Sequence, residues 1–191
     1  KVRIQVRFGT ESPQALFSYF DNRLQKGDYP LKDAATYGKA LALLQLKRTD
    51  EADALMQELA TRHPEDLFVV DALTDIDLAK GRSAQAIARL EKFRTRMPDN
   101  EVVVVNLGNA YLEGGNYKKS IAILDPYARE HEENNLAWSL LSDAYRKAGR
   151  MTDLHMARAE MLSLRGDYQA AIDELIVARG TTNDKLTLAR L

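Results

Sequence analysis

The stretch EVVVVNLGNAYLEGGNYKKSIAILDPYAREHEEN, residues 101–134, decides the fold, because its pattern recurs on both sides with a period of 34 residues. Its Gly115 is matched by Gly81 and Gly149, and each glycine follows an apolar run with helical spacing. A glycine at this place is typical of a helix C-terminus, where the backbone turns through positive φ. We therefore expect one helix to end before each glycine and another to begin two to three residues after it.

The same register places residues of one kind at corresponding positions of successive repeats. Small residues, which let two helices cross closely, recur at Ala40, Thr74, Gly108 and Ser142, and again at Ala52, Ala86 and Ser120. Large apolar residues recur at Leu73, Leu107 and Leu141, and again at Met56, Leu90 and Leu124. Aromatic residues and prolines recur at Tyr111 and Tyr145, and at Pro64 and Pro98. This is the tetratricopeptide-repeat (TPR) pattern, so we predict an all-α helical solenoid of antiparallel helix pairs.

Apolar periodicity divides the chain into helices. We predict them at 12–26, 31–46, 49–62, 67–79, 83–96, 101–113, 117–131, 135–147, 152–164 and 168–179. The array would span 12–191, with an extra N-terminal helix at 12–26, repeats at about 33–66, 67–100 and 101–134, and an irregular unit at 135–180. That last unit is irregular because Gly166 follows Gly149 by only 17 residues, half a period. Helix 152–164 is therefore expected to close one unit and open the next, in a small C-terminal subdomain.

The first eleven residues follow a different pattern. Apolar residues alternate with polar ones at Val2, Ile4, Val6 and Phe8. Alternation of period two is typical of a half-buried β-strand, which would pair with an upstream domain or with a second copy of the chain. The alternative is that residues 1–11 form a linker. Because the chain begins at Lys1 and shows no signal-peptide pattern, we interpret it as a fragment or a processed product.

Composition argues against several classes of function. The formal net charge is −1 and the basic residues are scattered, so we expect no nucleic-acid partner and no anionic membrane surface. No apolar stretch reaches transmembrane length. The chain has no cysteine, which excludes disulfides, thiolate nucleophiles and cysteine-ligated zinc within it.

Candidate catalytic motifs are incomplete. His131 and Glu132 begin like a zinc-protease motif, but Asn135 stands where the second histidine would be needed. The turn at Gly114 and Gly115 follows no strand and precedes no suitably placed lysine, so it is not a phosphate-binding loop. We therefore expect this chain to hold no metal or cofactor and to catalyse no reaction.

The remaining functional feature is the face formed by the first helix of each pair, which in helical solenoids binds peptides or proteins. The residues predicted to point there are Tyr37, Leu41, Phe68, Asp71, Asp75, Val105, Asn109, Leu112, Glu113, Ser139, Asp143 and Arg146. They mix apolar anchors with acidic groups, which suits an interaction hot spot. The alternative for Phe68 and Leu41 is simple packing against the neighbouring repeat.

Some TPR proteins grip a C-terminal carboxylate with lysine and asparagine side chains. Here only Asn109 falls at a position of that kind, while Asp71 and Asp75 stand where cationic and amide groups would be needed. Their carboxylates would repel a carboxylate ligand. The sequence therefore argues against a clamp for chaperone C-termini.

One segment is more specific than a generic repeat. In HMARAEMLSLRGDYQAAIDEL, residues 155–175, a helix with a doubled role is followed by an Arg-Gly-Asp turn. Together with the upstream order, a helix at 12–26 and then DAATYGKAL at 33–41, it resembles the C-terminal repeat domain of the beta-barrel assembly-enhancing protease family. The resemblance covers nearly the whole chain, is strongest at 154–175 and is weakest at 1–10.

The resemblance implies a function that the periodicity alone does not. In that family a zinc metallopeptidase domain precedes the repeats, so zinc is expected in an upstream domain and not in this chain. A periplasmic location in a Gram-negative bacterium is implied. The partners would be the barrel-assembly machinery, outer-membrane protein substrates and the protein's own protease domain. The alternative is a free-standing TPR adaptor or co-chaperone that binds a soluble protein.

Overall fold

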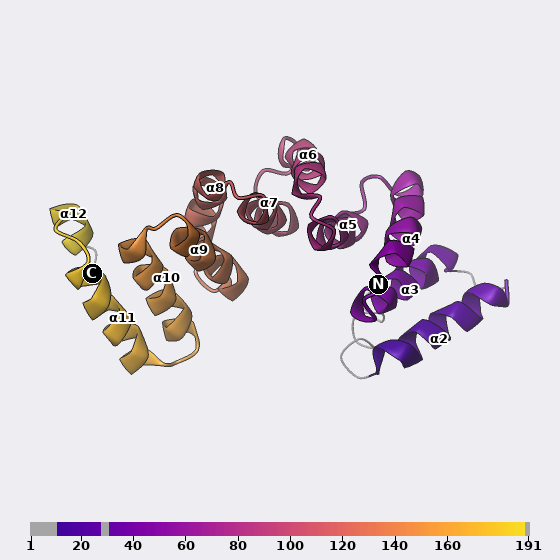
Figure 1. Ribbon diagram of the computed structural model, residues 1–191, viewed down its shortest axis with the longest axis horizontal. Helices are drawn as coiled ribbons and strands as arrows, with labels where there is room; N and C mark the ends of the chain where they lie inside the picture. Colours follow the sequence, from indigo (N-terminus) through magenta and orange to yellow (C-terminus); the bar gives the residue numbers. More distant parts are fainter. Residues whose placement is uncertain (1–10, 28–30, 190–191) are drawn as a thin grey trace. The chain divides into compact units, whose positions relative to one another are not determined.

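The computed structural model describes residues 11–27 and 31–189 and, in this part, contains helices and no strand. The helices are α2 (Pro13–Gln25), α3 (Lys32–Gln45), α4 (Thr49–Arg62), α5 (Leu67–Ala79), α6 (Ser83–Arg94), α7 (Glu101–Glu113), α8 (Tyr117–Glu130), α9 (Asn135–Lys147), α10 (Met151–Leu164), α11 (Tyr168–Gly180) and α12 (Lys185–Leu188) (Figure 1). The all-α TPR prediction is confirmed. The strand or linker predicted for the N-terminus lies outside the described residues, which begin at Glu11.

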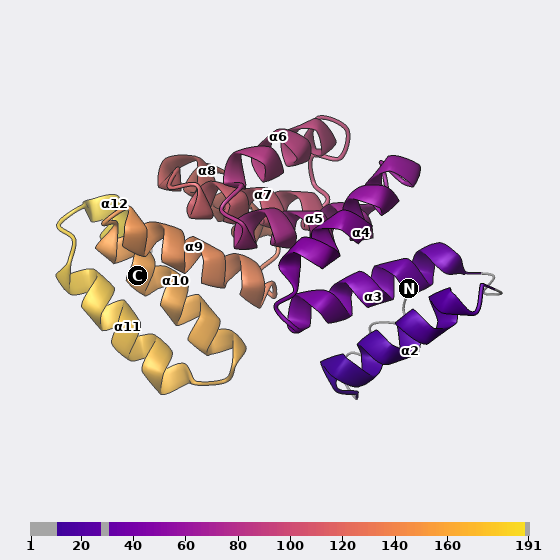
Figure 2. The same cartoon turned by 45° about the vertical axis from the view of Figure 1, so that its right-hand side comes forward.

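The chain divides into two compact units, 1–86 and 87–191. In the N-terminal unit α2 packs against α3, α3 against α4, and α4 against α5 (Figure 2). Their core is made of large side chains that are almost fully buried, among them Leu16, Phe20, Leu43, Met56, Leu59, Leu73 and Ile76. Each pair of helices thus buries one apolar face against the next, which is where most of the stability of short helices comes from.

In the C-terminal unit α7, α8, α9, α10 and α11 pack in chain order, and α7 also contacts α9. Helix α10 packs against both α9 and α11, and buries Leu154, Ala157 and Ala159. Figures 1 and 2 show α10 and α11 side by side, joined by a turn at Gly166. The doubled role expected of helix 152–164 corresponds to these two contacts.

The predicted helix ends match the backbone geometry. Gly81, Gly115 and Gly149 have φ values of 68°, 75° and 72°, as their place after a helix requires. Lys47 stands 34 residues before Gly81 and adopts φ 61° without being glycine. A left-handed backbone is uncommon for a residue with a Cβ atom, so only the repeat period, and not the residue type, points to this turn.

The close helix crossing predicted at Gly108 is present between α7 and α8. The Ser120 hydroxyl donates a buried hydrogen bond of 2.8 Å to the carbonyl oxygen of Gly108. A Cβ atom added at Gly108 would lie 2.4 Å from Cγ of Leu124, which is fully buried. Only a glycine lets the two helices approach this closely.

A charged network joins α4 to the end of α5 in the N-terminal unit. Asp53 lies 2.8 Å from both Lys80 and Arg82, and Arg82 also pairs with the fully buried Asp77 at 2.8 Å. Burial by itself raises the pKa of Asp53, but hydrogen bonds from Arg82, Lys80 and Gln57 outweigh it and lower the pKa to about 2. The ionised carboxylate is therefore favoured by the folded unit.

Acid is expected to destabilise the N-terminal unit through Asp53. The folded pKa lies below the ordinary value of 3.8, so the stabilisation is complete above about pH 4 and is lost as the pH falls towards 2. The loss should be about 2 kcal/mol, from the size of the pKa shift. Urea unfolding followed by hydrogen exchange in α3 to α5 measures it. Asp53→Asn should remove this part of the acid dependence, whereas Asp50→Asn should leave it; equal acid dependence in both variants would contradict the assignment.

Candidate functional site

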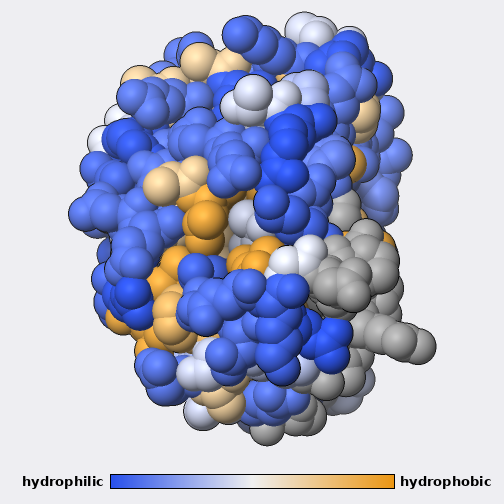
Figure 3. All heavy atoms as spheres, turned by 90° about the vertical axis from the view of Figure 1, so that its right-hand side faces the viewer, coloured by the Kyte–Doolittle hydropathy of each residue, from blue (hydrophilic) through white to orange (hydrophobic). Residues whose placement is uncertain are grey.

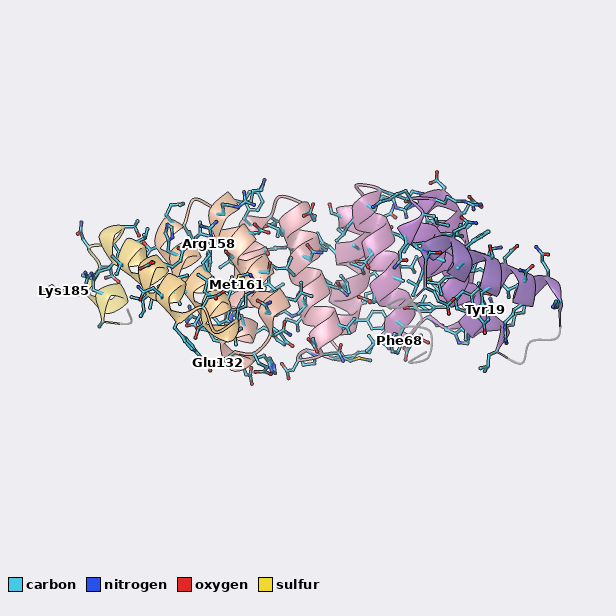
Figure 4. The ribbon with its side chains drawn as sticks, turned by 90° about the horizontal axis from the view of Figure 1, so that it is seen from below. Tyr19, Phe68, Glu132, Arg158, Met161 and Lys185 are labelled. Atoms are coloured by element: carbon cyan, nitrogen blue, oxygen red, sulfur yellow. The ribbon has the colours of Figure 1, made fainter. Side chains whose placement is uncertain are left out.

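An aromatic pair marks the N-terminal unit. The Tyr37 ring on α3 and the Phe68 ring on α5 meet edge to face, with centroids 6.4 Å apart. Asp66 caps α5 by accepting a hydrogen bond from the backbone N–H of Phe68, and so places Phe68 in the first helical turn. Tyr37 is buried but Phe68 is 38% exposed, so the pair offers an aromatic edge to a partner (Figure 4).

Three aspartates surround this pair. The pKa of Tyr37 is raised, first by burial and then by the negative charges of Asp71, Asp66 and Asp75. Partial burial, and then the charge of Asp71, raise the pKa of Asp75 to about 6, although the Asp75 side chain still reaches solvent. Carboxylates that raise one another's pKa form a locally negative surface. We refer to Tyr37, Phe68, Asp66, Asp71 and Asp75 as the aromatic–acidic face.

A cleft of about 500 Å³ adjoins this face and shares Tyr37 and Asp66 with it. Its other lining residues are Leu31, Lys32, Asp33, Ala34, Leu59, Arg62, His63 and Val69. Apolar side chains form one wall and charged groups the other. In the space-filling view of the N-terminal side of the molecule, apolar side chains gather in a hollow bordered by hydrophilic ones (Figure 3). Exposed apolar surface with a polar rim is typical of protein-binding sites.

The charged wall was not anticipated from the sequence. Asp33 pairs with Arg62, and its Oδ2 atom lies 2.5 Å from Nε2 of His63. The hydrogen bond with His63 lowers the pKa of Asp33; burial opposes this, and the charge of Arg62 adds to the lowering. We had interpreted His63 only as a helix-end residue, but it bridges the end of α4 to the start of α3.

A signal for this cleft was present in the repeat period. Two repeats further on, Glu101 and His131 occupy the positions of Asp33 and His63. They line a second cleft, of about 460 Å³, within the C-terminal unit. Comparing charged residues at equal repeat positions would have revealed both clefts.

The residues predicted for the C-terminal part of the face fall into two groups. Leu112, Glu113, Asp143 and Arg146 line one small cleft of about 190 Å³, where Arg146 pairs with Asp143 at 2.7 Å. The others are covered to different degrees, with Val105 buried and Asn109 and Ser139 half-buried. In the N-terminal unit, Leu41 is half-buried and packs against the core. The structure therefore brings together the aromatic pair with Asp71 and Asp75, and separately the four residues around Arg146.

Two negative findings concern the described part of the chain. No three or more histidine, cysteine, aspartate or glutamate side chains within 11–27 and 31–189 come together in a way that could hold a metal ion. None of the helices described is long and apolar enough to cross a membrane.

Comparisons with known proteins agree with the repeat pattern. Family models described as tetratricopeptide repeat match residues 34–66 and 77–144. The beta-barrel assembly-enhancing protease of Yersinia pestis is 37% identical over 86 residues, which make up 45% of this chain and 18% of that protein. The matched part thus spans about a fifth of the length of that relative.

Solved structures of TPR proteins share the fold. One from Thermus thermophilus is 22% identical, with a TM-score of 0.67 over 84% of this chain and 90% of its own. One from Parabacteroides merdae is 12% identical, with a TM-score of 0.67 over 97% of this chain and 79% of its own. Similarity at this level of identity supports the fold alone, whereas the Yersinia relative confirms the resemblance seen in the sequence.

Proposed function

Because the chain is an array of tetratricopeptide repeats, we propose that it is a protein-binding module whose aromatic–acidic face captures a basic, partly apolar segment of a partner protein. The observation that carries this proposal is the Tyr37–Phe68 pair, half-open to solvent and surrounded by three aspartates. An aromatic anchor supplies contact area, and nearby carboxylates attract lysine or arginine side chains.

The charge of the face determines which partners it favours. Asp71 and Asp75 repel each other, as the raised pKa of Asp75 indicates, and a partner cation placed between them relieves that repulsion. A partner carboxylate would add to it. The face therefore selects against C-terminal carboxylates and for positively charged side chains next to an apolar residue that reaches the adjoining cleft of about 500 Å³.

The proposed biological role follows from the similarity to the Yersinia protease. The module would dock a periplasmic zinc metalloprotease onto the outer-membrane barrel-assembly machinery and onto its barrel substrates, and would also contact the protease domain itself. The sequence of the gene upstream of this segment tests the role. A His-Glu-x-x-His motif is expected there; a short reading frame without it would favour a free-standing adaptor.

Binding to a purified barrel-assembly complex tests the face. Phe68→Ala and Asp75→Lys should each weaken the affinity of the chain by about tenfold, the loss expected when a central anchor or a facing charge is removed. The matched controls are Leu136→Ala, which truncates a side chain that is 60% exposed in the other unit, and Glu130→Lys, which reverses an exposed charge. Surface titration by biolayer interferometry measures all four. Unchanged affinity of both face variants would move the site elsewhere.

A further inference from the structure

Helix α11 exposes an apolar stripe. Tyr168, Ile172 and Ile176 lie four residues apart, so they share one face of the helix, and they are 65%, 50% and 54% exposed. The opposite face carries Ala171 and Ala178, which are buried. The helix is thus apolar on both sides, and a helix of that kind is normally covered on both sides.

The repeat pattern shows what covers this face elsewhere in the same unit. Helix α8 begins at Tyr117 as α11 begins at Tyr168, which makes Ile121 the counterpart of Ile172. Helix α8 lies between α7 and α9, and Ile121 is only 7% exposed. Helix α11 packs extensively against α10, and Ile172 remains 50% exposed. The same helix position is therefore covered in α8 and open in α11.

We propose that the open face of α11 binds an amphipathic α-helix of a partner protein, seated as α9 is seated against α8. The occupant would carry the α9 pattern, a small residue, an aromatic residue and a leucine as at Ala137, Trp138 and Leu141, all of which are buried in α9. Arg179, exposed on α11, stands where α8 has the fully buried Ala128. An acidic side chain on the occupant would match it.

The size of the face argues against a second copy of the chain as the occupant. A helix of 13 residues is roughly 20 Å long and about 10 Å wide, so two such faces would bury roughly 400 Å² in total. Stable dimers bury about 1,200 Å² or more. A single docked helix makes a small and reversible contact, which suits a transient complex. This second surface does not depend on the aromatic–acidic face.

A labelled peptide with the sequence of residues 134–148 is the probe, and fluorescence anisotropy with the whole chain is the measurement. We expect saturable binding that Ile172→Glu weakens by about tenfold or more, as for a central apolar anchor. The controls Leu136→Glu and Asp75→Lys should not change it, so failure here is separate from failure of the aromatic–acidic face.

Two further measurements close the test. Ile172→Glu should melt close to the parent chain, because the side chain is half exposed; should it unfold, the pair Tyr168→Ala and Ile176→Ser replaces it. Equal peptide binding by these variants and the parent, or no binding by the parent, would overturn the proposal. So would a dimer in sedimentation that Ile172→Glu dissociates, because the face would then pair with itself.

Discussion

Gly108→Val is expected to destabilise the C-terminal unit by about 3 kcal/mol, the upper part of the range for overpacking a tight core. The new side chain would enter space occupied by Leu124, whose Cγ atom would lie 2.4 Å from the added Cβ. Leu124 is fully buried and cannot swing into solvent. Trp138, the one tryptophan of the chain, is buried in the same unit and reports its unfolding by fluorescence in a urea titration.

The control for this change is Gly180→Val, because an added Cβ there meets nothing within 4 Å. Combining Gly108→Val with Leu124→Ala should recover part of the lost stability, since the smaller side chain makes room. A Gly108→Val protein that unfolds at the same urea concentration as the parent would show that α7 and α8 do not cross as closely as described.

Arg82→Met is expected to destabilise the N-terminal unit by about 3 kcal/mol, in the range found when one partner of a buried ion pair is removed. Asp77 is fully buried, and the guanidinium of Arg82 lies 2.8 Å from its carboxylate and 2.8 Å from Asp53. Without Arg82 the folded unit must keep two carboxylates close together with less compensating charge. Urea unfolding followed by hydrogen exchange in α4 and α5 measures the effect.

Arg48→Met is the matched control, because Arg48 pairs with Glu51 while both side chains are largely exposed. Exposed pairs contribute about 0–1 kcal/mol, so this variant should stay within that range of the parent. Adding Asp77→Asn to Arg82→Met should restore stability if the buried charge is the cause. Equal losses for Arg82→Met and Arg48→Met would assign the network no special role.

The repeat period predicted much of the fold because each repeated position answers one packing requirement. Gly108 could be predicted at a helix crossing, since its register contains only small residues. The contact of Gly38 with Phe20 could not, although a Cβ at Gly38 would lie 2.5 Å from that ring. Gly38 stands outside the glycine register, and its partner lies on the extra helix α2, which has no repeat equivalent.

The candidate site was only partly predictable for a related reason. Tyr37, Phe68 and Asp75 could be named because helical periodicity places them on one side of the first helices of two repeats. The pairing of Asp33 with His63 joins residues 30 apart in the sequence at helix ends, where periodicity gives no direction. The open face of α11 also escaped prediction, because periodicity identifies apolar positions but not whether a following helix covers them.

In-cell photo-crosslinking from position 68 of the full-length protein tests the central claim most directly. A photoreactive side chain in place of Phe68 should crosslink to a barrel-assembly component or to an outer-membrane protein substrate, and Asp75→Lys should reduce that product strongly. A probe at Leu136 should not give it. Absence of any such crosslink from position 68, with the same partner captured instead from Leu136, would contradict the claim that the aromatic–acidic face binds proteins.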